Sequence, residues 1–302
     1  MSILPSPSPR PSPGLLRPIL VGGTGRSGST IVGHLLDHHR DLVLARPMEV
    51  RFIAGNDGLA DALSVAVRKP GSDEARAAAE LAVDRLQHRW FERAENVGLH
   101  QSMSRADVAD WSREYLAAFG ADPVTASRTL AYRIMDRIAA RLDADRLVDT
   151  TPANARKADR IEVIYPESLV VVVTRDGRDV AASFVSQPFG PNDVFEALAQ
   201  WEQRMLRTHK AVAGCRPGRV HTVDLLDLVV RDRPEALREL CAFLGVDVDP
   251  GMVEWFDANV TPAGMHPGRW RSDFDEATGA RLDAAYDAAC ARLAEAGVAI
   301  PA

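Results

Sequence analysis

The sequence is poor in lysine, cysteine, aromatic residues and long apolar runs, and each shortage excludes a class of protein. The basic residues are almost all arginine, with lysine only at positions 69, 157 and 210, and the formal net charge is -6. A chain with this balance has no general basic surface for nucleic acid, although it is compatible with a local basic pocket. The longest apolar run, Leu169–Val173, has strand length and falls far short of the roughly 18 residues of a membrane span.

The three cysteines, Cys215, Cys241 and Cys290, lie far apart and show no metal-ligand spacing. An odd number of isolated cysteines is typical of buried thiols in a reducing compartment. The N-terminus has no charged segment followed by an apolar one, so it does not resemble a secretory signal. We therefore expect a cytoplasmic protein without a metal site.

The chain divides into a short tail and one long domain. Residues 1–17 alternate proline and serine, which removes backbone donors and favours extended polyproline geometry. Hydrophobic residues make up 46% of the sequence, enough for a substantial core. We predict a disordered tail over residues 1–17 and one folded domain over residues 18–302.

Apolar runs of strand length alternate with segments of helical periodicity. The predicted strands are 18–21, 42–44, 146–149, 169–174 and 219–223. Helices are predicted near 155–165 and 195–211, each before one of the last two strands, and near 234–244 after the last strand. Residues 169–173 are apolar throughout, as in a central parallel strand covered on both faces. This alternation predicts an α/β fold with a central parallel sheet. Residues 59–141 have a helical pattern, broken at Pro70-Gly71 and at residues 120–123.

A glycine-rich loop, Gly23–Thr30, separates the first predicted strand from the first predicted helix. Small residues at such a place let backbone N–H groups and the helix N-terminus converge on an anion. The spacing fits a dinucleotide loop, with Glu49 near the distance expected of a ribose-binding acid, and equally a nucleotide-triphosphate loop. An ordinary glycine-rich turn that caps a helix is the third interpretation.

Both nucleotide interpretations meet a difficulty. In a triphosphate loop, Ser29 stands where a lysine should bridge the β- and γ-phosphates, and Asp149 is the only acidic strand end for magnesium. A dinucleotide loop has no use for Arg26 inside it. Hydride transfer also gives no role to a second basic motif.

That second motif is V-V-V-T-R-D-G-R-D-V-A-A-S-F, residues 171–184. A buried strand carries Arg175 to its C-terminal end, where ligands bind in open α/β sheets. Ser183 lies about two helical turns further on and can face back over the strand end, so both side chains can donate to a phosphate monoester. The alternative is that Arg175, Asp176 and their neighbours form a surface charge cluster at a helix start.

Together the two motifs resemble the sulfotransferases that use 3′-phosphoadenosine-5′-phosphosulfate (PAPS) as sulfuryl donor. The resemblance implies that Arg26 contacts the phosphosulfate bridge, and that Arg175 and Ser183 hold the 3′-phosphate. The loop residues that it implies for the 5′-phosphosulfate are Gly25, Arg26, Ser27, Gly28, Ser29 and Thr30. It also implies a P-loop-like three-layer α/β fold and a reaction that needs no metal.

Further segments extend this resemblance from Ile19 to about Arg281. Residues 149–154 and 165–166 resemble the family's segment upstream of the 3′-phosphate site, and residues 239–245 resemble its late helix. Residues 267–271 resemble the C-terminal basic loop that closes over the nucleotide. This last likeness implies nucleotide contacts by Arg269, Trp270 and Arg271.

The acceptor hydroxyl must lose a proton as its oxygen attacks sulfur, so a base is useful within hydrogen-bond reach. Residues 46–52 resemble the E-x-R segment of the tyrosylprotein branch, which implies Glu49 as base and Arg51 as an acceptor contact. The alternative is a surface ion pair of Glu49, which would leave His100 or His266 as base.

The chain departs from the family pattern in two places. The tyrosylprotein branch has a catalytic lysine before the proline of residues 149–152, but this chain has Thr150 and Thr151. Arg26, alone or with Thr150, would then stabilise the sulfonate oxygens. The usual aromatic near the fifth strand is replaced within residues 225–229, which leaves Trp270 as a candidate for packing on adenine.

We therefore predict a sulfotransferase that moves the sulfuryl group of PAPS to a hydroxyl by in-line displacement. The acceptor would be a small molecule, a sugar, a lipid headgroup or a tyrosyl side chain, with no nucleic acid or membrane as partner. The helical residues 59–141 are expected to shape the acceptor side. A P-loop kinase-like phosphotransferase and a non-catalytic nucleotide-binding module are the alternatives, with a dehydrogenase behind them.

Overall fold

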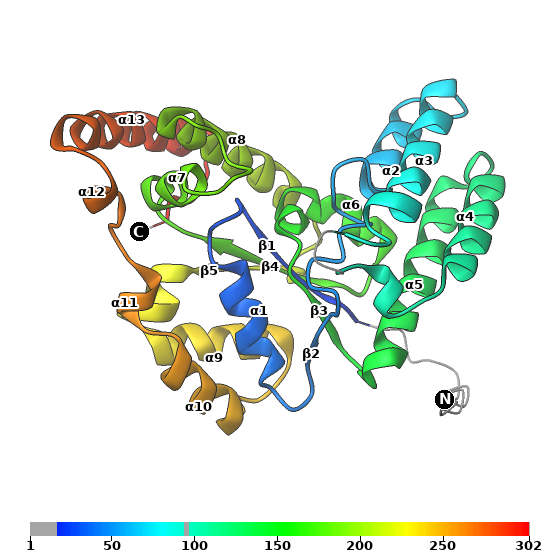
Figure 1. Ribbon diagram of the computed structural model, residues 1–302, viewed down its shortest axis with the longest axis horizontal. Helices are drawn as coiled ribbons and strands as arrows, with labels where there is room; N and C mark the ends of the chain where they lie inside the picture. The colour runs from blue at the N-terminus through cyan, green and yellow to red at the C-terminus, as the bar shows by residue number, and fades with distance from the viewer. Residues whose placement is uncertain (1–16, 94–96, 302) are drawn as a thin grey trace.

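A five-stranded parallel sheet is the centre of the computed structural model, which describes residues 17–93 and 97–301 (Figure 1). The strands are β1 Ile19–Gly23, β2 Val43–Leu44, β3 Leu147–Asp149, β4 Leu169–Thr174 and β5 Val220–Asp224, in the order β2-β3-β1-β4-β5. The α/β fold with a central parallel sheet is thus confirmed. The predicted tail lies outside the described residues except for Arg17.

The two faces of the sheet bury alternate residues of each strand. Ile19 and Val21 of β1 belong to one core cluster, whereas Leu20 between them belongs to another. In the register of β1 with β4, Val21 lies beside Val171 and Leu20 beside Val170, so each strand continues the same two clusters. Successive residues of β4 point to opposite faces and are buried on both, which explains its unbroken apolar run.

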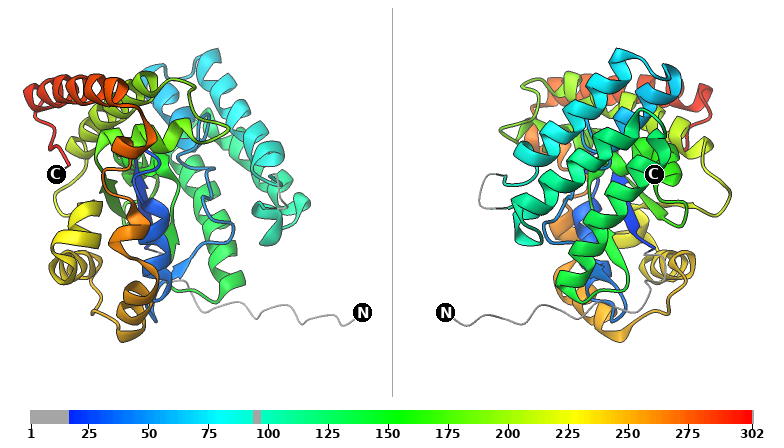
Figure 2. Two further views of the ribbon diagram at one scale, coloured as in Figure 1. Left: turned by 60° about the vertical axis from the view of Figure 1, so that its left-hand side comes forward. Right: turned by 90° about the vertical axis from the view of Figure 1, so that its right-hand side faces the viewer.

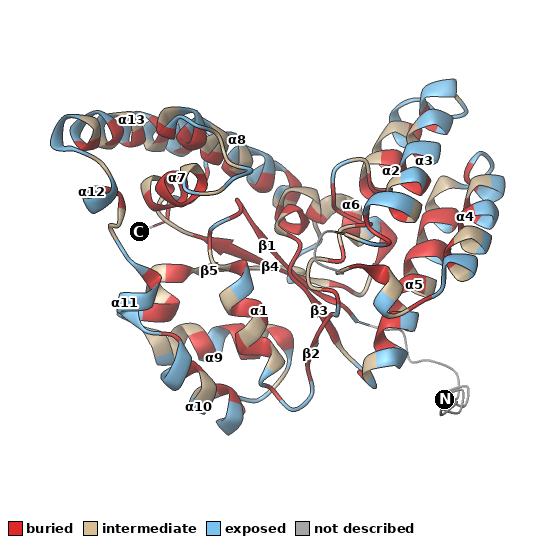
Figure 3. Ribbon diagram, in the orientation of Figure 1, coloured by how far each residue is buried: buried red, intermediate tan, exposed pale blue. Residues whose placement is uncertain are grey.

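Helices cover both faces and flank the sheet (Figures 1 and 2). They are α1 Ser29–Asp37, α2 Leu59–Arg68, α3 Asp73–Asp84, α4 Arg105–Phe119, α5 Pro123–Leu142, α6 Ala158–Ile164, α7 Gly177–Val185, α8 Val194–Ala213, α9 Arg233–Leu244, α10 Pro250–Asn259, α11 Pro262–Met265, α12 Trp270–Asp273 and α13 Glu276–Glu295. Helices α1, α9 and α10 contribute to the core cluster of the Val21 face, and α2 to α6 contribute to the core cluster of the Leu20 face. Helices α7, α8, α12 and α13 form a third cluster beside them. Figure 3 shows the strands buried between these layers.

Several element boundaries differ from those predicted. Strand β1 continues through Gly22 and Gly23, because both pair with β4. The helix predicted at 155–165 is a 3-10 helix, η4 Pro152–Lys157, followed by the short α6. Within 59–141 the predicted breaks separate α2 from α3 and α4 from α5. This region also holds a π-helix, η1 Arg85–Arg89, and a 3-10 helix, η3 Leu99–Gln101.

The strand order places a change of direction at β1. From β1 the chain runs outward to β2 and returns through β3, and it then crosses to β4 and β5 on the other side of β1. Ligands of open α/β sheets bind at such a point, outside the C-terminal ends of the strands. Among the described helices, none is both long and apolar enough to cross a bilayer.

Candidate functional site

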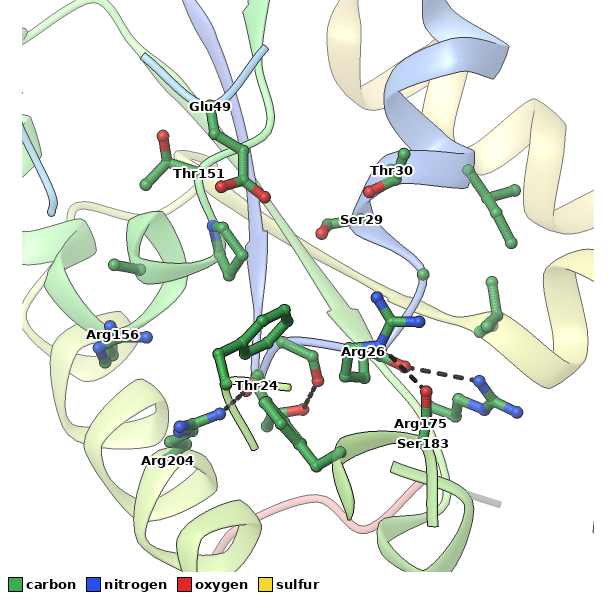
Figure 4. Close-up of a pocket in the computed structure, with 18 of the residues that line it drawn as sticks. Thr24, Arg26, Ser29, Thr30, Glu49, Thr151, Arg156, Arg175, Ser183 and Arg204 are labelled. Atoms are coloured by element: carbon green, nitrogen blue, oxygen red, sulfur yellow. Dashed lines mark hydrogen bonds between the residues drawn. The ribbon is translucent and has the colours of Figure 1, made fainter. Parts of the chain in front are cut away.

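A cavity of about 540 Å³ opens at the C-terminal ends of the strands (Figure 4). Its lining includes Thr24 directly after β1, Arg175 after β4 and Leu225 after β5. Thr151 contributes from the end of β3, and Glu49 from the loop after β2. The volume lies within the range of small-molecule sites. The fold therefore brings residues separated by 200 positions into one pocket.

The glycine-rich loop has a backbone that side chains would disturb. Gly28, the N-cap of α1, has φ 101°, and a Cβ there would lie 2.7 Å from the buried Leu225 side chain. A Cβ on Gly25, at φ 81°, would lie 3.0 Å from Phe184. Glycine is required at both positions for conformation and for space. The loop is thus packed closely against Phe184 of α7 and against Leu225, which follows β5.

The two basic motifs meet across this loop. Nε of Arg26 donates to Oγ of Ser183 at 3.0 Å, although 157 positions separate them. Arg175 points to the same place, with Nη1 3.5 Å from the Arg26 carbonyl oxygen. In Figure 4 the three side chains form one group at the edge of the pocket. Arg175 and Ser183 therefore line the cavity, and Arg175 forms a largely buried ion pair with Asp179 instead of lying in an exposed charge cluster.

The buried carboxylate of Asp179 ties this group to the C-terminal loop. It accepts a hydrogen bond from the Gly268 backbone N–H at 2.9 Å and forms an ion pair with Arg175 at 3.5 Å. Burial raises the pKa of Asp179, and these two partners oppose the rise. Burial in turn lowers the pKa of Arg175, which Asp179 opposes. Asp179 thus positions both Arg175 and the C-terminal loop that contains Gly268.

Glu49 and Arg51 both line the cavity, and they form an ion pair with each other. Nε of Arg51 donates to Oε2 of Glu49 at 3.0 Å, and Nη2 of Arg51 also contacts that oxygen. Hydrogen bonds to Asp149, the last residue of β3, and to Thr151 hold residues 49–51 in place. The Val50 N–H donates to the buried Asp149 carboxylate at 2.9 Å, and the Arg51 N–H donates to the Thr151 hydroxyl at 3.1 Å. Asp149 therefore serves as an anchor for the Glu49 loop, and it does not line the cavity.

The cavity is strongly cationic. Its arginines are Arg26, Arg51, Arg89, Arg156, Arg175, Arg204 and Arg269, whereas Glu49 is the only carboxylate among the described lining residues. Burial, together with the charges of Arg204 and Arg207, lowers the pKa of Arg156 to about 10. Since the whole chain is acidic, this surplus of positive charge is local and points to an anionic ligand.

Most of the residues predicted for the site line the cavity. These are Gly25, Arg26, Gly28, Ser29, Thr30, Glu49, Arg51, Arg175, Ser183 and Arg269. Ser27 is a loop residue that is fully buried, and its hydroxyl has no hydrogen-bond partner in the described structure. Of the histidines considered as bases, His266 lines the cavity, but His100 is not among the lining residues and its Nδ1 lies 3.0 Å from the Phe91 carbonyl oxygen.

The C-terminal basic loop differs from its prediction at two positions. Trp270 is 4% exposed in the core beside α7 and α13, with Arg178 and Arg271 stacked on its ring. Neither Trp270 nor Arg271 lines the cavity, so this arrangement does not support contact with a nucleotide. Thr150, a proposed helper of Arg26, is likewise buried outside the cavity, against Gly33.

Sequence reasoning missed Arg156 and Arg204 as cavity residues. Arg204 projects from α8, where its Nη1 donates to the Thr24 carbonyl oxygen at 2.6 Å and its guanidinium lies over the Phe184 ring. Arg156 lies in η4, four residues after Pro152 of a segment that the sequence did single out. In a chain that uses arginine for nearly every basic position, neither residue stands out.

Comparison with known proteins agrees with this geometry. The sequence model of the sulfotransferase family matches residues 18–250. The structure is similar to the sulfotransferase domain from the Synechococcus PCC 7002 olefin synthase, with a TM-score of 0.51, 17% identity, and coverage of 93% of this chain and 98% of that domain. It is also similar to a sulfotransferase from Mycobacterium avium, with a TM-score of 0.51, 12% identity, and coverage of 95% and 78%. No curated protein matches the chain.

Proposed function

The chain belongs to the sulfotransferase family, and we propose that it transfers the sulfuryl group of PAPS to a hydroxyl of an acceptor. One observation carries the proposal. The loop Gly23–Thr30 and the pair Arg175 and Ser183 line one cavity, joined by the hydrogen bond from Arg26 to Ser183. A donor with phosphates on the 3′ and 5′ oxygens of its ribose needs two anion sites in one cavity, because each phosphate requires its own donors.

The residues present fit this donor. Nε of Arg175 and Oγ of Ser27 are buried without a partner in the described structure, so both have unused hydrogen-bonding capacity. Gly25 and Gly28 keep the loop free of side chains. We assign the 5′-phosphosulfate to residues 25–30 and the 3′-phosphate to Arg175 and Ser183. PAPS would supply an activated sulfuryl group with 3′,5′-bisphosphoadenosine as its leaving group.

The acceptor side of the reaction uses Glu49. Oε2 of Glu49 is held by Arg51, and no hydrogen bond to Oε1 is found in the described chain. Oε1 accepts the acceptor's hydroxyl proton while the hydroxyl oxygen forms its bond to sulfur and the bond from sulfur to the departing phosphate oxygen breaks. Arg51 orients the carboxylate, and Arg26 stabilises the charge that develops on the leaving oxygen.

The residues of the cavity give no support to phosphotransfer from ATP. No lysine is found among the described lining residues, and Ser29 occupies the position of the usual loop lysine. Asp149, the acidic strand end considered for magnesium, accepts hydrogen bonds from Val50, Thr151 and Asn154 instead. A triphosphate bound here would lack the loop lysine and the acidic magnesium ligand of the usual triphosphate site.

Thermal unfolding with a panel of nucleotides tests the donor. At 100 times its dissociation constant, bisphosphoadenosine should add about 2.7 kcal/mol of stability without any metal. AMP at the same concentration should add much less, because it lacks the 3′-phosphate, and ATP with magnesium or NAD should do no better than AMP. If AMP stabilises the protein as much as bisphosphoadenosine does, Arg175 and Ser183 do not belong to the donor site. Incubation with labelled PAPS and a panel of phenols and sugars then identifies an acceptor.

A further inference from the structure

Arg156 and Arg204 lie on the side of the cavity away from Arg175 and Ser183, with Arg26 between them in Figure 4. The donor's phosphates, as proposed above, use Arg26, the loop and the Arg175 side. The phosphates of the proposed donor therefore leave Arg156 and Arg204 without a ligand.

Arg156 lacks the partners that a half-buried arginine normally has. No hydrogen bond or ion pair to its guanidinium is found in the described chain. The carboxylate that acts on it, Asp61, is bound by Lys157 Nζ at 2.7 Å. Its neighbours Arg204 and Arg207 carry the same charge, and burial adds a desolvation cost. A bound anion would offset both the repulsion between these arginines and the cost of desolvating Arg156.

The surroundings of Arg156 also connect it to the proposed base. It lies in η4, which follows directly on Thr151, and the Thr151 hydroxyl accepts from the N–H of Arg51 at 3.1 Å. The cavity lining also includes the aromatic residues Trp90, Phe184 and Phe189, and the Arg204 guanidinium lies over the Phe184 ring. Rings of this kind offer an apolar surface for the body of a ligand.

We propose that the acceptor carries an anionic group besides its hydroxyl, a carboxylate, sulfate or phosphate, and that Arg156 with Arg204 binds this group. This inference rests on the proposed function, since it takes the donor to occupy the other side. The planar guanidinium of Arg156 suits a bidentate contact with any of these anions. Arg204 has a second role, because it also holds the Thr24 carbonyl oxygen.

Pairs of compounds that differ only in charge test the site. Hydroxy acids such as 4-hydroxyphenylacetate and 3-hydroxybutyrate, and 4-hydroxyphenyl phosphate, are compared with their neutral amide or ester counterparts by calorimetry, with and without bisphosphoadenosine. At least one acid should bind roughly 10- to 100-fold more tightly than its neutral counterpart, the effect of a charged hydrogen bond. The tighter binder among the carboxylate and phosphate members identifies the preferred anion of the two.

Arg156→Gln should abolish this preference and leave binding of the neutral compound unchanged, whereas Arg156→Lys should retain part of it. The matched control is Arg207→Gln. Arg207 is exposed on α8 and acts on Arg156 electrostatically, but it does not line the cavity, so its loss should leave the preference intact. Bisphosphoadenosine affinity should change little in either variant.

The outcomes separate the two proposals. If no acid of the panel binds more tightly than its neutral counterpart, or if Arg156→Gln leaves the preference unchanged, the acceptor inference is wrong. If bisphosphoadenosine fails to bind the wild-type protein, the proposed function is wrong, and the acid preference measured on the free protein still decides whether the anion site exists.

Discussion

Three residues of the candidate site, Arg26, Glu49 and Arg51, have left-handed backbone torsions, with φ of 57°, 54° and 65°. Such torsions cost a non-glycine residue roughly 1–2 kcal/mol and persist only where the surroundings determine them. For Glu49 and Arg51 those surroundings are two hydrogen bonds. The Val50 N–H donates to Asp149, and the Arg51 N–H donates to Thr151. The direction of these side chains therefore depends on β3 as well as on their own loop.

Glu49→Gln tests the proposed base. Glutamine keeps the volume and can still accept from Arg51, so folding and bisphosphoadenosine affinity should hardly change. Turnover should fall by about 10²- to 10⁴-fold, the usual contribution of a positioned general base. The loss should be smaller for an acidic phenol than for an alcohol, because the phenol's proton is easier to remove. Near-wild-type turnover of an alcohol would make the Glu49–Arg51 pair structural, and His266 would be the next residue to test.

Arg175→Ala tests the proposed 3′-phosphate site. The variant should bind bisphosphoadenosine roughly 10- to 100-fold more weakly, since one charged hydrogen-bond donor is lost. AMP affinity should stay nearly constant, which makes AMP the internal control in the same calorimetric series. The rate at saturating PAPS should change little, because the 3′-phosphate keeps its charge during transfer. A large loss of that rate with unchanged affinity would contradict this role.

At the scale of elements, the site depends on how β1 passes into α1. Strand β1 runs to Gly23 and α1 begins at Ser29, so five residues must turn the chain and leave room for a ligand. The left-handed Gly25, Arg26 and Gly28 accomplish the turn. Leu225, which follows β5, packs against Gly28, so the loop is supported from a neighbouring strand.

Gly28→Ala, compared with Gly245→Ala, measures that support. Both glycines have left-handed torsions, but a Cβ at Gly245 would meet nothing within 4 Å, whereas at Gly28 it would overlap buried Leu225. Gly245→Ala should lower the free energy of unfolding by about 1–2 kcal/mol and leave nucleotide binding intact. Gly28→Ala should cost more and also weaken bisphosphoadenosine binding. Chemical denaturation and calorimetry give the two quantities, and equal effects of the two substitutions would contradict a role for the close contact.

The sequence predicted the sheet well because its signals are local. The apolar run of β4, the loop after β1 and the placement of Arg175 all follow from short patterns in the chain. Trp270 was mispredicted as a nucleotide contact because its environment comes from α7 and α13, far away in the sequence. Arg156 and Arg204 were missed for a related reason. Their place in the cavity depends on how η4 packs against β1 and α8, and no local pattern in the chain encodes that packing.

For the whole molecule, the distribution of charge matters more than its sum. The chain carries a net charge of -6, yet its main cavity is lined by seven arginines and one described carboxylate. An anionic donor is therefore repelled by the molecule as a whole and attracted by one concave region of it. Such a field acts over about a Debye length, roughly 8–10 Å near physiological salt.

This distribution predicts that donor binding depends on salt although the protein is acidic. Between 50 and 300 mM KCl, bisphosphoadenosine affinity should fall by roughly threefold to tenfold as screening weakens the attraction of the arginines. Arg175→Ala should flatten the dependence, because it removes one positive charge from the proposed 3′-phosphate site. Arg68→Ala, which removes an exposed charge of α2 outside the lining, should leave the slope unchanged. Calorimetric titrations at four salt concentrations give the slopes. If affinity does not vary with salt, or if both variants change the slope equally, the attraction does not come from the arginines of the cavity.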